Sequence, residues 1–180
     1  MKGRQLLFSL ILIIVSVNPF TEKLEFSSPV IYMLSHYALV SSGFILGHAI
    51  LKTKWYFMPV GLTPIAFWHL PLPFALGATY IGLRIVLEIT IFLGGFLAGS
   101  SIWALPQWGK ISLFILYMIG DTALSILFIV ESPLYSNRLY PFSPYPPSSL
   151  PLAGIAMIVV MNLILATVIY VMFKNLLRGL

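Results

Sequence analysis

Residues 152–172 read LAGIAMIVVMNLILATVIYVM, and this stretch decides the fold of the chain. It is apolar almost throughout, and a helix of about 20 apolar residues matches the thickness of a bilayer. Its side chains do not alternate between apolar and polar, as they do in the strands of a membrane barrel. Because backbone groups in a bilayer must be satisfied within a helix or a closed barrel, the stretch predicts a transmembrane helix.

The rest of the chain has the same character. Of its 180 residues, 59% are hydrophobic and only 8% are charged, and its mean hydropathy is +1.00. A chain of this composition lacks the polar surface that a water-soluble globule needs. We therefore predict an all-α protein, a single transmembrane helical domain that crosses the plasma membrane several times and has the lipid bilayer as its main partner. Six spans are predicted, at residues 6–17, 30–51, 59–78, 81–104, 111–130 and 152–173.

The first predicted span, residues 6–17, also has features of a signal peptide, because it is short and follows the basic segment 1–5. Residues 15–19 read VSVNP, which does not resemble a small-residue cleavage site. We therefore expect the helix to be retained.

The basic residues predict that both termini face the cytoplasm, because Lys and Arg accumulate in short cytoplasmic loops. In this orientation seven of the ten Lys and Arg residues lie on the cytoplasmic side, namely Lys2, Arg4, Lys52, Lys54, Lys110, Lys174 and Arg178. Lys23, Arg84 and Arg138 remain outside. The net charge of +5 then follows from topology, and we expect no nucleic-acid partner.

The longest outer connection, residues 131–151, contains six prolines and three tyrosines. Such a segment is too stiff for a flexible linker. We expect it to lie across the outer face of the bundle with Tyr135, Tyr140 and Tyr145 at the membrane interface. The shorter outer connection, residues 18–29, is expected to be a polar loop.

Glycines four residues apart predict close packing between helices. The pairs are Gly43 with Gly47 and Gly95 with Gly99. Small residues at this spacing let two helix backbones approach closely. We expect this packing within the chain rather than between two copies of it.

The third predicted span contains four prolines, Pro59, Pro64, Pro71 and Pro73. Proline has no backbone N–H, so Pro73 leaves the carbonyl of His69 without its helical donor. We expect a kinked or partly unwound span, in which protein, water or a ligand satisfies the freed groups.

The informative polar residues inside the predicted spans are His36, His48, His69, Glu88, Asp121 and Asn162. A charged group at this depth costs roughly 2.5–3.5 kcal/mol, so each needs a partner or a function. At a rise of about 1.5 Å per residue, His36, His69 and Glu88 fall in one layer in the outer half of the bundle, whereas His48 falls near the cytoplasmic end. Asp121 is open to several roles, as a protonated strut, a proton relay or a partner of Asn162.

Two methionines extend the pattern of the histidines. Met33 lies one turn outward from His36, and Met157 lies at the outer side of the last span. The chain has no cysteine, and imidazole with thioether ligands suits copper, particularly Cu(I), better than zinc or magnesium. The candidate metal ligands are therefore His36, His69, Met33 and Met157.

Glu88 is the candidate acceptor for a histidine N–H in this metal site. A competing interpretation has the methionines as packing residues and the histidines as hydrogen-bonded struts. In that interpretation Glu88 pairs with Arg84, one turn away on the same helix, and both reach outward.

Several segments resemble the CtaG-type family. They are residues 35–39 (SHYAL), 67–71 (FWHLP), 86–90 (VLEIT), 103–106 (WALP), 133–135 (PLY) and 152–157 (LAGIAM). The similarity covers about residues 31–160, and the chain is also similar to small uncharacterised crenarchaeal membrane proteins. The resemblance implies a polytopic protein that delivers copper to, or assists assembly of, a cytochrome oxidase.

The chain departs from that family at several polar positions. The CtaG-type pattern has histidines where this chain has Ile85 and Ile89, and an Asp-Gln pair where it has Ser149 and Leu150. The resemblance therefore implies the fold more firmly than the activity.

Three functions follow as expectations. The first is assistance in assembling, or delivering copper to, a respiratory terminal oxidase, with oxidase subunits as partners and copper as the only cofactor. The second is a non-catalytic accessory subunit that packs against a larger complex through its glycine faces and the outer loop. The third is haem b ligation by His36 and His69. No glycine-rich phosphate loop, Gly-x-Ser-x-Gly or His-Glu-x-x-His motif occurs, so we do not expect an enzyme.

Overall fold

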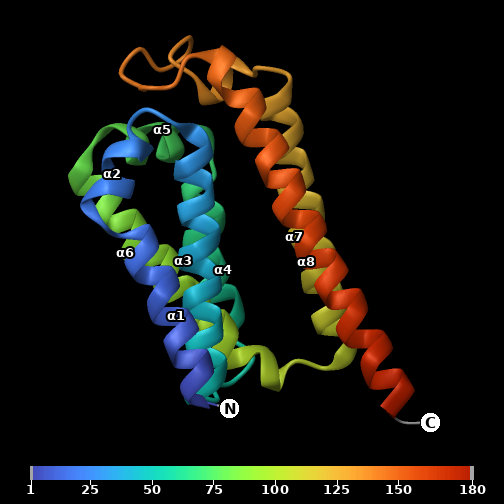
Figure 1. The fold of residues 1–180 in the computed structure, drawn as a ribbon. Helices are drawn as coiled ribbons and strands as arrows, with labels where there is room; N and C mark the ends of the chain where they lie inside the picture. Colours follow the sequence, from blue (N-terminus) through green and yellow to red (C-terminus); the bar gives the residue numbers. More distant parts are fainter. Residues whose placement is uncertain (1, 179–180) are drawn as a thin grey trace.

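Helices α3 (Pro29–Ile50) and α6 (Ile81–Ser101) pack side by side at the centre of the fold. The computed structural model describes residues 2–178 (Figure 1). All regular elements in this range are helices, and none is a strand. The all-α class is thus confirmed. The other elements are α1 (Lys2–Ser16), α2 (Pro19–Glu25), α4 (Phe57–Trp68), α5 (Pro71–Thr79), α7 (Gln107–Ile129), α8 (Leu150–Arg178) and the 3₁₀ turns η1 (Ile102–Ala104), η2 (Pro133–Tyr135) and η3 (Pro147–Ser149).

Four stretches are long and apolar enough to cross a membrane, at Pro29–Ile50, Ile81–Ala104, Gln107–Ile129 and Pro147–Val171. Two bent helix pairs raise the number of spans to six if each pair is one broken span. The first pair, α1 and α2, bends by 55°, and the second, α4 and α5, bends by 72°. The bend of the second pair agrees with the broken span that its prolines predict.

Helix α2 corrects the prediction of a polar loop at residues 18–29. Asn18 caps the helix, because its side chain accepts hydrogen bonds from the backbone N–H groups of Phe20 and Thr21. Pro19 follows at the first helical position, where its missing N–H costs nothing. These two residues start a short helix that places Glu22 and Glu25 against the bundle.

The glycine pairs hold α3 and α6 together, as predicted. A Cβ atom added at Gly43 or Gly47 would collide with the backbone of α6 at Phe92 or Phe96, and one at Gly99 would collide with the backbone of α3. Both glycine faces are therefore buried within the chain. An accessory subunit could not use them to bind a partner, which corrects that part of the prediction.

Replacing Gly43 with leucine should destabilise the bundle by about 1–3 kcal/mol or more, because overpacking at a backbone contact forces the two helices apart. Thermal unfolding of the purified protein in detergent measures the effect. Gly120→Leu is the control, since nothing lies within 4 Å of a Cβ at Gly120. Equal stability of the two variants would contradict this packing.

Segment 131–149 lies across one end of the bundle, as predicted (Figure 1). That this end faces outward stays a prediction. The tyrosines of the segment, however, do not all lie at the interface. Tyr135 and Tyr145 are buried, and they point inward to hydrogen-bond with the backbone of His69 and Glu25. Only Tyr140 is partly exposed. The two tyrosines point inward because the carbonyls of His69 and Glu25 need hydrogen-bond donors.

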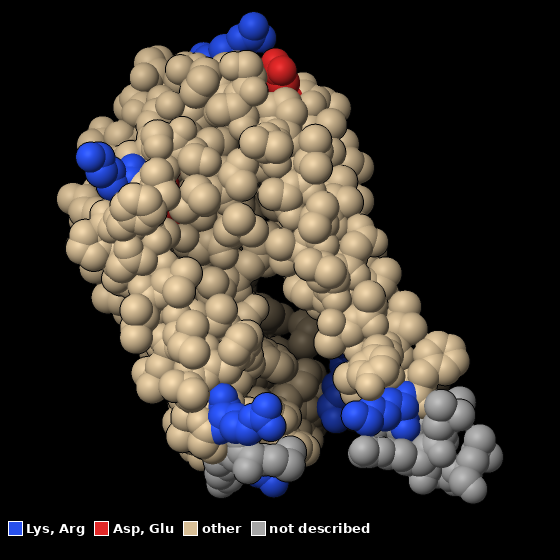
Figure 2. Space-filling view, viewed as in Figure 1, with Lys and Arg blue, Asp and Glu red and all other residues tan. Residues whose placement is uncertain are grey.

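The two ends of the described chain lie at the same end of the bundle, opposite segment 131–149 (Figure 1). Many of the Lys and Arg side chains visible from this side gather there too (Figure 2). Reporter fusions at Lys2 and at Leu180, which lies outside the described residues, should therefore both report the cytoplasm. A reporter at Leu180 that faces outward would overturn the predicted topology.

Candidate functional site

His69 lies at the break between α4 and α5. Pro71 starts α5, and Pro73 has no N–H to give to the carbonyl of His69. That carbonyl instead accepts a hydrogen bond of 3.0 Å from the hydroxyl of Tyr135. Burial raises the pKa of Tyr135, so its hydroxyl stays protonated and able to donate. The sequence predicts that protein, water or a ligand satisfies this carbonyl, and the Tyr135 hydroxyl is the group that does so.

The ring of His69 is also fixed by the break. Its Nδ1 lies 2.6 Å from the carbonyl oxygen of Ile65, one turn earlier in α4. A carbonyl can only accept, so Nδ1 carries the proton and donates. Nε2 is then the nitrogen with a free lone pair, which is the form of histidine that binds metals.

Removing the hydroxyl of Tyr135 tests this arrangement. In Tyr135→Phe the carbonyl of His69 loses its donor, which should cost about 1–3 kcal/mol of unfolding free energy. Thermal or denaturant unfolding in detergent measures the loss. Tyr140→Phe, in the same segment but only partly buried, should change stability little. Identical behaviour of the two variants would contradict the role of Tyr135.

His36 lies beside His69. Its side chain, on α3, is 2% exposed, and neither of its ring nitrogens has a hydrogen-bond partner among the described residues. The ring centroids of the two histidines are 5.4 Å apart, and the rings are inclined at 78°. Tyr32 packs against the other side of His36, with ring centroids 4.3 Å apart. The structure thus brings together two histidines that are 33 residues apart in sequence.

The two candidate methionine ligands lie in the buried core. Met33 on α3 and Met157 on α8 belong to one cluster with the aromatic side chains of Tyr32, Trp68 and Phe74. This environment suits packing residues as well as ligands. Their role as ligands stays a prediction.

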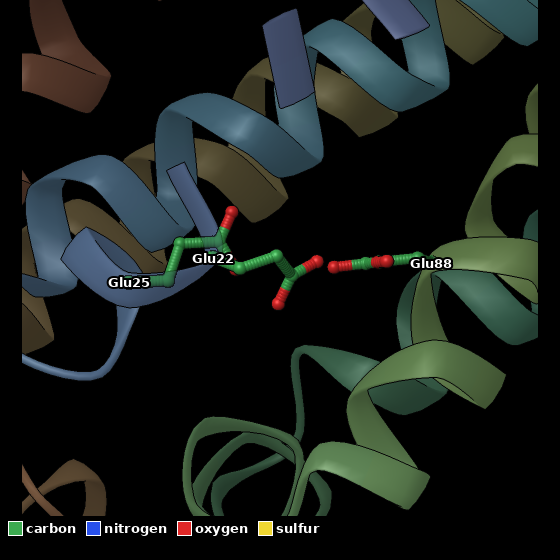
Figure 3. Close-up of side chains that lie close together, drawn as sticks. All are labelled: Glu22, Glu25 and Glu88. Carbon is green, nitrogen blue, oxygen red and sulfur yellow. The ribbon is translucent and has the colours of Figure 1, made fainter. Parts of the chain in front are cut away.

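Glu88 does not approach the histidines as predicted. Among the described residues it hydrogen-bonds neither His36 nor His69, and its Oε1 has no partner. It points instead toward Glu22 and Glu25 of α2 (Figure 3). One carboxylate oxygen from each of the three lies within 4.8 Å of the others. We call these three residues the acidic cluster.

Arg84 supplies the counter-charge to the acidic cluster. It is fully buried, and one of its terminal nitrogens lies 3.5 Å from Glu25 and 3.7 Å from Glu22. It also donates to the carbonyls of Gly77 and Ala78 at the end of α5. The predicted Arg84–Glu88 pair that reaches outward is therefore wrong. Arg84 turns inward because α2 offers carboxylates and α5 offers unpaired carbonyls there.

Aromatic groups enclose the guanidinium of Arg84. It lies 3.8 Å from the ring centroid of Phe26 and 5.4 Å from that of Tyr32, as expected for cation–π contacts. The hydroxyl of Tyr145 donates to the carbonyl of Glu25. Burial raises the pKa of Tyr145, which keeps its hydroxyl a donor. Segment 131–149, α2 and α6 are thus joined at one place.

Sequence reasoning missed Glu22, Glu25 and Tyr145 as members of the site. The glutamates fall in residues 18–29, for which the sequence predicts a polar loop. The signals available were the Asn18–Pro19 start of a helix and the spacing of three residues between the glutamates, which puts both on one helix face.

Asp121 and His48 lie apart from these groups. Asp121 accepts hydrogen bonds from the hydroxyls of Tyr37 and Tyr117, whereas Asn162 donates to the carbonyl of Ile158. Asp121 and Asn162 are therefore not partners. The ring of His48 stacks on Trp103 with centroids 4.4 Å apart, away from His36 as predicted.

These features define a polytopic α-helical membrane protein with buried histidine and acidic groups near the end that segment 131–149 covers. The chain belongs to the family of proteins of unknown function DUF1404, which matches residues 7–175. No curated protein and no solved structure matches the chain.

Proposed function

We propose that this protein binds one copper ion between His36 and His69 and assists the assembly of a respiratory terminal oxidase by delivering it. The observation that carries the proposal is the pair of unpartnered nitrogens on the buried ring of His36. A buried polar group without a partner costs about 1–3 kcal/mol, so native proteins rarely retain one without a reason.

A metal ion bound to one of these nitrogens would remove part of this cost. Two metal–nitrogen bonds of about 2 Å each require ring nitrogens about 4 Å apart. Rings with centroids 5.4 Å apart can present nitrogens at such a distance. The free Nε2 of His69 supplies the second lone pair, and the hydrogen bond from Nδ1 to Ile65 holds the ring in place.

The surroundings favour Cu(I) among the metals. The ring of Tyr32 packs against His36, and Met33 and Met157 belong to the same core cluster as Tyr32. Two carboxylates, Glu22 and Glu25, are engaged with Arg84. Neutral imidazole and thioether ligands select Cu(I), whereas magnesium and calcium need oxygen ligands. The link to a terminal oxidase rests on the resemblance of residues 35–39 and 67–71, which contain both histidines, to the CtaG-type family.

Metal analysis and a visible spectrum of the purified protein test the proposal. We expect one copper per chain after loading with Cu(I) under reducing conditions, and no Soret band. A Soret band would instead support haem b ligation. Absence of bound copper after loading would overturn the copper-delivery function.

An accessory subunit is the second candidate, and helix α7 favours it. In an apolar stretch of 18 residues of α7, only 17% is buried inside the protein, against 44% in the corresponding stretch of α3. A hollow separates the α7–α8 hairpin from the other helices toward the end that carries the termini (Figure 2). Such a subunit would contact its complex through α7, and co-purification of oxidase subunits that is lost in Ile119→Lys would support it.

A further inference from the structure

A groove on the flank of the bundle reaches the acidic cluster. Its volume is about 640 Å³, and its walls come from α1, α3 and α6, among them Ile13, Ile85 and Leu93. Ile85 is 49% exposed, so the groove opens toward the lipid. Two acidic side chains, Glu22 and Glu88, are the charged groups in this otherwise apolar lining.

Acidic side chains outnumber basic ones at this end of the groove. Arg84 makes ion pairs with Glu22 and Glu25. Glu88 makes none among the described residues, although its side chain is only 5% exposed and its Oε1 has no hydrogen-bond partner. Three carboxylates thus share one guanidinium, and the one left over lines the groove.

A divalent metal ion fits this place poorly. Arg84 lies within 4 Å of two of the three carboxylates and would repel a doubly charged ion about twice as strongly as a singly charged head. Calcium and magnesium also require about six oxygen ligands. An ammonium group needs only one or two acceptors, and an aliphatic chain attached to it would match the apolar walls.

We propose that this groove binds an amphiphile with a primary ammonium head and an aliphatic tail. The head donates hydrogen bonds to Glu88 and Glu22, and the tail lies along α1 and α6. The volume falls within the range of about 300–1,000 Å³ that is usual for ligand sites. Charge-assisted hydrogen bonds in an apolar site then favour the ammonium over an uncharged head.

The chain offers a matched control groove on α7. This groove, of about 430 Å³, is lined by Phe114, Ile115 and Ile126 among others, and it has no carboxylate in its lining. It lacks acceptors for an ammonium head, so we expect no saturable binding of the probes there. Ile126 is 52% exposed, close to the value for Ile85, so the two positions tolerate the same substitution.

Native mass spectrometry of the metal-free protein in an uncharged detergent tests the proposal. The probes are a long-chain primary alkyl ammonium and the alcohol and alkyl sulfate of the same chain length. We expect saturable binding of one alkyl ammonium per chain, at least roughly tenfold tighter than either comparison probe, because only this head can make the charge-assisted bonds. Equal binding of the alcohol would overturn the proposal.

Variants locate the site. Glu88→Gln should weaken alkyl ammonium binding by roughly tenfold or more, since it removes the unpaired carboxylate. Ile85→Trp should abolish binding by filling the groove, and Ile126→Trp should leave it unchanged. Ile85→Trp keeps the charges, so it tests the site even if Glu88→Gln fails to fold. Binding that survives Ile85→Trp would overturn the proposal.

Binding measurements in bilayer discs distinguish a membrane lipid from a soluble amphiphile as the source of the ammonium head. Selective retention of a lipid with a primary ammonium head over its N-trimethyl counterpart would identify a membrane lipid. Binding of the free alkyl ammonium alone would identify a soluble amphiphile with the same chemistry. Binding of neither would contradict the proposal.

Discussion

His36→Leu should abolish copper binding while leaving the metal-free protein at least as stable as the wild type. Leucine removes two buried ring nitrogens that have no partner in the described structure, so the variant loses no hydrogen bond. Copper per chain, measured after loading and washing, should fall from one to none. Thermal unfolding without metal should show an equal or higher midpoint, and oxidase activity of membranes from cells that carry the variant should fall.

His69→Leu distinguishes a ligand from a strut at the neighbouring position. It should also abolish copper binding, but it removes the hydrogen bond to Ile65 and should cost about 0.5–1.5 kcal/mol of unfolding free energy. His48→Leu is the control, because His48 stacks on Trp103 away from the pair. Copper content and oxidase activity that stay unchanged in both His36→Leu and His69→Leu would leave the accessory subunit as the better candidate.

Arg84→Met should produce the largest loss of stability, about 3–5 kcal/mol, because removing one partner of a buried ion pair leaves uncompensated charge. It also leaves the carbonyls of Gly77 and Ala78 without donors. Denaturant unfolding in detergent measures the change. Arg138→Met, at an exposed position in segment 131–149, is the control.

A double variant keeps this prediction testable if Arg84→Met does not accumulate. Glu25→Gln combined with Arg84→Met removes a carboxylate together with its counter-charge, so it should recover part of the loss. The Arg84→Lys variant should be less stable than the wild type, because lysine keeps the charge but lacks the planar guanidinium that reaches several acceptors. No recovery in the double variant would contradict the ion pair as the cause.

The helices could be predicted from sequence because each spanning stretch is apolar over its own length, as residues 152–172 are. The break at His69 could also be predicted, since the chemistry of Pro71 and Pro73 is local to the backbone. That Gly43 lies at a close helix contact could be predicted from the size of glycine, although its partner helix could not. In each case the cause lies within a few residues of its effect.

The acidic cluster could not be predicted in the same way. Spacing along one helix suggested that Arg84 pairs with Glu88, whereas the partners of Arg84 lie about 60 residues earlier on α2. Such contacts depend on how the helices are arranged in space, which hydropathy does not report. The proximity of His36 and His69 could be predicted only because their estimated depths in the membrane place both in one layer.

The contact between α2 and α6 sets a condition on biogenesis. Helices α1 and α2 leave the ribosome before α6 and carry Glu22 and Glu25, but their cation is encoded 62 residues after Glu22. Until α6 has been synthesised, the two carboxylates face lipid or water without a counter-ion. Insertion of the N-terminal pair is therefore provisional and is completed only when Arg84 arrives, so a nascent chain that stops before α6 should be a substrate for membrane proteolysis.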